Sequence, residues 1–192
     1  MRTIEMSAKD MAPRVARYNE LKPLAVQDDP DITLEAKDLI YARRILSVIG
    51  LEGVTTPVND GAPIKGAGGM TIAMAICPPG QGPSLHSHGT TYETFTVLEG
   101  RFEISWNDDG RDSLLLERFD TVSVPPGVSR AFRNVGDEEG ILQVLITGGV
   151  HDMNDIDFSP AVAEKVAAVH GPALDAFKKA GFTFTAGTDT TE

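Results

Sequence analysis

The sequence predicts an all-β fold, a sandwich or barrel of many short strands. Short runs rich in β-branched and aromatic residues recur at even spacing, and glycine, proline, asparagine or aspartate separates them. Residues 107–110 and 136–140 have the composition of hairpin turns. Strands are predicted at 70–77, 84–88, 91–99, 101–107, 113–117, 121–124, 129–135 and 141–147. The length of 192 residues suits one domain with extended ends.

The segments on either side of these strands differ in composition. Residues 1–36 are polar and broken by prolines, so they predict an N-terminal arm, with a short helix at 10–21. The apolar run at 39–49 predicts a further strand, and the glycine-rich residues 50–69 predict a loop. Helices are predicted at 159–170 and 172–181, each opened by a proline. The expected organisation is therefore an arm at 1–36, a barrel at 37–150 and a C-terminal helical extension and tail at 151–192.

The composition excludes several classes of function. With 28 acidic and 17 basic residues the net charge is −11, which disfavours nucleic acid and anionic membrane surfaces as partners. No run approaches the length of a membrane-spanning helix, and the start of the chain has no apolar leader. Cys77, the single cysteine, cannot form an internal disulfide. We expect a cytoplasmic protein that acts on small molecules.

The candidate site lies in residues 80–100. His86 and His88 are two positions apart, so in a strand both side chains point to the same face. Glu93 follows after a gap that a short turn can close. Two imidazoles and one carboxylate are the ligand set of a divalent transition metal such as Fe, Mn, Zn or Ni, and they leave coordination positions open.

The spacing of these residues resembles the first motif of the cupin superfamily. That motif reads glycine, five residues, His-x-His, four residues, glutamate, six residues and glycine, and each fixed position is present from Gly80 to Gly100. The second motif is only partly matched. Pro125, Gly127 and Asn134 fit it, whereas Phe119 replaces a glycine and Arg130 replaces the histidine that is the fourth metal ligand. The resemblance implies a double-stranded β-helix, a jelly-roll barrel of the cupin type-2-like class.

Strand alternation predicts which side chains face the barrel interior. Glu93, Phe95 and Val97 share one face of their strand. Arg130, Phe132 and Asn134 share one face of theirs, so Arg130 is expected beside Glu93 and the histidines. Two interpretations follow. Either the three ligands hold a metal and Arg130 binds an anionic substrate, or Arg130 pairs with Glu93 and no metal binds.

The first interpretation gives the predicted function, a metal-dependent enzyme that resembles the oxygenases and isomerases of the superfamily and acts on an organic anion. The alternative is a non-catalytic ligand-binding protein without metal. Weaker substrate contacts are predicted at Phe95, Phe132, Asn134 and Gln143, of which Gln143 faces either a ligand or solvent. His151, after the last strand, is a disfavoured further ligand. A homodimer formed through the terminal segments is also expected.

Overall fold

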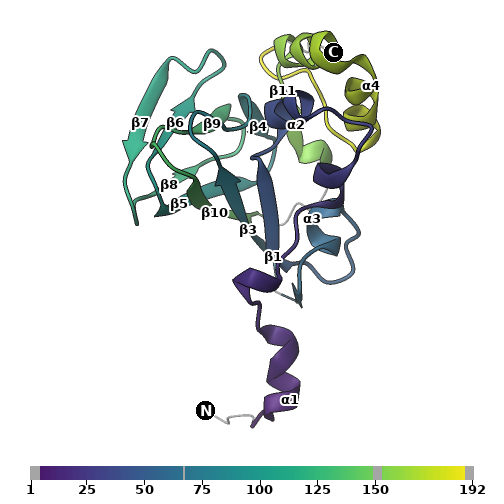
Figure 1. The fold of residues 1–192 in the computed structure, drawn as a ribbon, viewed down its shortest axis with the longest axis vertical. Coiled ribbons are helices and arrows are strands. Elements are labelled where there is room, and N and C mark those ends of the chain that lie inside the picture. Colours follow the sequence, from purple (N-terminus) through teal and green to yellow (C-terminus); the bar gives the residue numbers. More distant parts are fainter. Residues whose placement is uncertain (1–4, 67, 149–152, 189–192) are drawn as a thin grey trace.

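The computed structural model describes residues 5–66, 68–148 and 153–188, which form two facing β-sheets with a helical layer at one end (Figure 1). The strands are β1 Arg44–Gly50, β2 Ile64–Lys65, β3 Met70–Cys77, β4 His86–His88, β5 Tyr92–Glu99, β6 Phe102–Trp106, β7 Asp112–Leu116, β8 Thr121–Val124, β9 Arg130–Asn134, β10 Gly140–Thr147 and β11 Ile156–Phe158. One sheet has the order β2-β1-β3-β10-β5-β8 and the other β11-β4-β9-β6-β7. Apart from the parallel β1–β2 pair, neighbouring strands are antiparallel.

The predicted jelly-roll barrel is confirmed. Each of the eight strands predicted between residues 70 and 147 is present, and their ends agree within a residue or two. The agreement follows from the turns, because glycine and aspartate corners fix where a strand ends more sharply than strand propensity does.

The predictions for the first 50 residues are partly wrong. In place of a helix at 10–21 there are α1 Ala8–Met11 and the 3-10 turns η1 Ala12–Arg14 and η2 Tyr18–Glu20. Extended backbone at Val15 and Arg17 separates these turns. The run at 39–49 is divided between the end of α2 Leu34–Ile40 and the strand β1, because an apolar run alone does not distinguish helix from strand.

The remaining helical elements lie outside the barrel sheets. They are η3 Ala25–Asp28, α3 Pro57–Asp60, η4 Met153–Asp155 and α4 Pro160–Lys179. The two C-terminal helices of the prediction are the two halves of α4, which bends at His170, where φ is −158°. Proline at position 172 explains the bend, because it removes a backbone donor from the helix. Among the described helices, none is long and apolar enough to cross a membrane.

The buried side chains form two clusters, which we call the barrel core and the cap core. The barrel core consists of Ala42, Ala75, Cys77, Phe95, Val97, Phe102, Ile104, Leu116, Val124, Phe132 and Leu142. The cap core consists of Leu24, Ile32, Ala36, Ile40, Tyr41, Phe158, Val162, Val166, Ala173, Phe177, Phe182 and Phe184. Residues from both ends of the described chain thus build the cap, with α2 against α4, and close one end of the barrel (Figure 1). The first residues, around α1, project away from the body.

Phe119, which stands where the second motif has a glycine, adopts a backbone conformation that favours glycine. Its φ is +75°, close to the +78° of Gly127 in the same motif. A bulky side chain is rare in this left-handed region, because its Cβ crowds the following carbonyl oxygen. The Phe119 side chain is 68% exposed and lies under the guanidinium of Arg118 at 4.6 Å. The turn at Phe119 therefore has a geometry that favours glycine, although the residue is a phenylalanine.

Candidate metal centre

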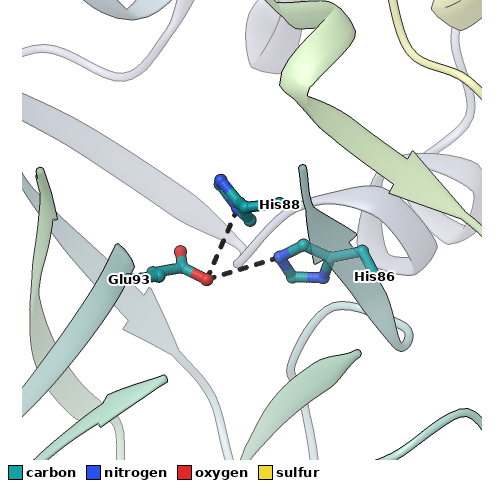
Figure 2. Close-up of side chains that lie close together, drawn as sticks. All are labelled: His86, His88 and Glu93. Atoms are coloured by element: carbon teal, nitrogen blue, oxygen red, sulfur yellow. Dashed lines mark ion pairs between the residues drawn. The ribbon is translucent and has the colours of Figure 1, made fainter. Parts of the chain in front are cut away.

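Three side chains from two strands converge at the end of the barrel that the cap covers. His86 and His88 lie on β4 and Glu93 on β5, and Figure 2 shows both rings turned toward one carboxylate oxygen. Glu93 Oε2 is 3.6 Å from His86 Nε2 and 3.5 Å from His88 Nε2. His86, His88 and Glu93 are 6%, 2% and 5% exposed, respectively. The ligand-type atoms of these three residues all lie within 4.8 Å of one another.

These distances fit a metal ion better than hydrogen bonds. A nitrogen and an oxygen 3.5–3.6 Å apart are beyond hydrogen-bonding distance, and the buried Glu93 Oε2 has no hydrogen-bond partner. A tetrahedral ion with bonds of about 2.1 Å has ligand atoms about 3.4 Å apart. The cluster could therefore hold a divalent metal with little movement of its side chains.

A hydrogen bond to the backbone orients the ring of His86. Its Nδ1 lies 2.9 Å from the carbonyl oxygen of Ser84, which can only accept, so Nδ1 carries the proton. In the neutral ring the lone pair is then on Nε2, the nitrogen that faces Glu93. The same ring lies against Phe158 of the cap core, with centroids 5.2 Å apart. Packing and hydrogen bonding together hold Nε2 in a position to bind a metal.

A carboxylate from the cap orients His88. Its Nδ1 lies 3.2 Å from Asp155 Oδ2 and 2.9 Å from Thr91 Oγ1. Asp155 also accepts hydrogen bonds from the hydroxyl of Thr91 and from the backbone and hydroxyl of Thr90. Burial by itself raises the pKa of Asp155, but these hydrogen bonds outweigh it and hold the pKa well below its usual range. His88 thus donates from Nδ1 to an ionised carboxylate and presents Nε2 to the site.

Sequence reasoning did not identify Asp155. It lies 67 positions after His88 in the sequence and belongs to none of the motif spacings. The local sequence shows an acidic cluster before the last helix, and such a cluster is equally typical of an ordinary solvated turn. The pairing of β11 with β4, which places Ile156 opposite His88, brings Asp155 to the histidine.

The charge on Glu93 is stabilised by its neighbours. Burial raises its pKa, while His88, His86 and Arg130 lower it, and the net effect is a pKa of about 2. Glu93 is therefore ionised at neutral pH. An anionic ligand facing two imidazole nitrogens is the charge arrangement that a divalent cation requires.

Arg130 lies beside the metal centre, near the same Glu93 oxygen that the histidines face. It is 0% exposed, its Nε is 3.6 Å from Glu93 Oε2, and its Nη2 donates to the carbonyl oxygen of Pro125 at 3.3 Å. Nε and Nη1 have no hydrogen-bond partner. Burial lowers the pKa of Arg130, and the charges of Glu93 and Asp155 oppose this. Arg130 and Glu93 therefore do not form the close bidentate pair that is typical of arginine and carboxylate.

A cavity of about 110 Å³ lies between the metal centre and the cap. Its walls are Leu24, Ile40, Tyr41, Ala42, Ile45, Val58, Thr71, Ala73, Ala75, Pro83, His86, His88, Glu93, Phe132, Val144, Ile146, Met153, Ile156, Phe158 and Phe182. The three ligand-type residues form one part of this lining. Arg130 is not among the described residues that line it, so the expected substrate contact by Arg130 has no support in this arrangement.

The four weaker candidates occupy different places. Phe132 lines the cavity, whereas Phe95 is enclosed in the barrel core. Asn134 stabilises a turn, donating to the carbonyl oxygens of Cys77 and Glu138 and accepting from the backbone of Gly136. Gln143 is paired with Thr96 on the outer face of its sheet, opposite to the face of Val144, which lines the cavity. Of the two alternatives for Gln143, the structure therefore favours the solvent-facing one. His151 lies outside the described residues.

Comparisons with known proteins agree with this architecture. Residues 73–147 match the family model of the cupin domain. A comparison with curated proteins gives no match. The cupin domain of Schizosaccharomyces pombe Cnp3 is 18% identical, with a TM-score of 0.40 over 44% of this chain and 60% of that one.

Two bacterial structures show similar values. An uncharacterized conserved protein with a double-stranded β-helix domain from Klebsiella pneumoniae is 23% identical, with a TM-score of 0.40 over 43% of this chain and 70% of that one. A protein described as a predicted oxalate decarboxylase from Thermotoga maritima is also 23% identical, with a TM-score of 0.37 over 40% and 64%. The family match and the two-sheet barrel lead to one conclusion: residues 73–147, which form most of the barrel, are a cupin domain.

Proposed function

We propose that this protein is a metal-dependent enzyme that acts on a small molecule inside the cupin barrel. The observation that carries the proposal is the buried oxygen of Glu93, which has no hydrogen-bond partner and faces the Nε2 atoms of His86 and His88. A carboxylate in this position is costly to bury unless a cation or a donor compensates it. Arg130 compensates this charge in part from 3.6 Å, and a divalent metal would compensate it by direct contact with the oxygen.

Each residue of the site has a separate task in this proposal. His86, His88 and Glu93 would hold the metal through two nitrogens and one oxygen. Ser84 and Asp155 keep the proton on Nδ1 of the two rings, so that both Nε2 atoms remain available. The cavity walls exclude bulk water from the reacting molecule. A bound metal would supply Lewis-acid or redox chemistry, which is the basis of an oxygenase-like or isomerase-like reaction.

One observation favours the alternative, a ligand-binding protein without metal. The guanidinium of Arg130 is fully buried, and its Nε is as close to Glu93 Oε2 as the histidine nitrogens are. A unit charge repels another by about 4 kcal/mol at 4 Å when the effective dielectric constant is 20. Arg130 therefore weakens metal binding. Glu93 has a single charge, so it cannot fully neutralise both a divalent ion and Arg130.

Metal content distinguishes the two functions. We expect protein purified without chelator to contain about one transition-metal ion per chain, and the His88→Ala variant to contain almost none. His170→Ala is the matched control, because His170 lies at the bend of α4 and not among the three ligand-type residues. An open coordination position is then tested by adding nitric oxide to the Fe(II)-loaded protein and recording the electron paramagnetic resonance spectrum.

The enzyme proposal is wrong if the wild-type protein takes up no more metal than the His88→Ala variant. It is also wrong if the loaded metal does not react with nitric oxide, because a closed site cannot bind a reacting molecule. The homodimer and the cytoplasmic location stay predictions.

A further inference from the structure

We propose that the ligand of the cavity is a small, mainly apolar molecule with a single polar group, which it presents to the metal centre. The sequence predicts an organic anion, and this inference limits such a ligand to a single polar group. The inference rests on the proposed function only for the polar end of the ligand, since the apolar end is recognised by the walls alone.

The chemistry of the walls carries the inference. The metal centre forms one part of the lining, and the rest comes from aliphatic and aromatic side chains of the barrel and the cap. Apart from the metal centre, the only polar side chains among the described residues of the lining are the neutral hydroxyl groups of Tyr41 and Thr71. Such a wall stabilises a ligand by removing apolar surface from water, at about 25 cal/mol per Å².

The distribution of charge excludes a second ionised group on the ligand. Among the described residues, no lysine or arginine lines the cavity, and Arg130 lies outside the lining, with Nε 3.6 Å from Glu93 Oε2 and Nη2 on the carbonyl oxygen of Pro125. A ligand with a charge at each end could place one at the metal centre, but the other would face hydrocarbon. Burying an unpaired charge there costs more than burial of a small apolar body provides.

The size of the cavity limits the ligand further. Its volume of about 110 Å³ is somewhat below the volume of about 150 Å³ at which an apolar protein cavity accepts benzene. The ligand is therefore no larger than about one six-membered ring or a short branched chain. Polymers and nucleotides are too large for this cavity.

Three probes with the same number of non-hydrogen atoms test the proposal. Fluorobenzene has no ionisable group, phenol has one hydroxyl, and malonate has a charge at each end. Fluorobenzene binding is followed by fluorine NMR, in chelator-treated and in Zn(II)-loaded protein, and the other two compounds are added as competitors. We expect saturable binding of fluorobenzene in both forms. In the chelator-treated form, phenol should displace fluorobenzene at concentrations at least tenfold lower than malonate does. Phenol should also compete more effectively in the Zn(II) form than in the chelator-treated form.

Two alanine variants locate the binding site. Ala73→Leu places three further carbon atoms in the cavity and should weaken fluorobenzene binding at least tenfold. Ala131→Leu makes the same change on β9 at a position that does not line the cavity, and should leave binding within about twofold. The melting temperatures of both variants show whether each is folded.

The outcomes separate this inference from the proposed function. If fluorobenzene does not bind, or if malonate competes as well as phenol does in the chelator-treated form, the inference is overturned. The same holds if a folded Ala73→Leu variant binds fluorobenzene as the wild type does. If fluorobenzene binds in both forms but no Zn(II) is taken up, the apolar pocket stands and the metal-dependent function fails.

Discussion

The barrel and the cap contribute to the same site in different ways. The barrel provides the ligand-type atoms, which lie on β4 and β5 at positions that the first motif specifies. The cap provides what surrounds them: Asp155 on His88, Phe158 against His86, and much of the cavity wall. The comparison teaches that a motif locates the reactive atoms, while the surrounding polarity and shape come from segments with no fixed spacing to it.

The largest expected effect is on the free energy of unfolding, and it tests whether the barrel and the cap unfold together. Phe177 in the cap core and Phe102 in the barrel core are both fully enclosed. We expect Phe177→Ala and Phe102→Ala each to lower the free energy of unfolding by about 3–5 kcal/mol. Ile45 packs against both clusters, so a single transition is expected.

Two spectroscopic signals follow the unfolding of the barrel and of the cap separately in urea. The fluorescence of Trp106, the single tryptophan, reports on β6 of the barrel, and far-ultraviolet circular dichroism reports largely on α4. Coincident curves in both variants would support one cooperative unit. A loss of helical signal in Phe177→Ala at urea concentrations that leave the fluorescence unchanged would show that the cap unfolds alone.

The second prediction concerns the barrel side of the site. Arg130→His removes a positive charge next to Glu93 and puts an imidazole where the cupin motif has its fourth ligand. Affinity for Zn(II) should rise about 100-fold, because one unit of repulsion is lost and one nitrogen ligand is gained. Arg133→His is the control on the same strand, since Arg133 is exposed and binds the carbonyl oxygen of Gly80. Equal affinity of the two variants, measured against a competing chelator, would contradict the proposed metal position.

The third and smallest effect concerns the cap side. Asp155→Asn leaves His88 without its ionised partner and should lower Zn(II) affinity about 10- to 100-fold. Asp157→Asn is the matched control on β11, where Asp157 binds Thr185 and not the histidine. The pKa of Asp155 is lowered by its hydrogen bonds, so its contribution to stability is present above the ordinary aspartate pKa. That contribution is lost as the pH falls through the lower folded pKa. The difference in the free energy of unfolding between the two variants should therefore be constant from pH 6 to 8. Equal affinities would show that Asp155 does not influence the metal.

The parts of this protein that the sequence predicts are those fixed by local chemistry. Turn residues located the strands between 70 and 147, and alternation placed Glu93 and Arg130 in the interior. Whether Arg130 reaches the cavity depends on how β9 lies against β5. The alternation of side chains along a strand gives no information on the distance between two strands. Asp155 arrives through a strand pairing across a large sequence separation, which no local pattern encodes.

The late position of Asp155 in the sequence has a consequence for the order in which the site is completed during synthesis. The strands that hold His86, His88 and Glu93 emerge from the ribosome before β11 and α4 do, because synthesis proceeds from the N-terminus. The three ligand-type residues are therefore synthesised before Asp155, Phe158 and Phe182, which cover the open end of the barrel. A nascent chain therefore passes through an interval in which the metal centre is more open to solvent than in the finished fold, and that interval ends when the cap packs.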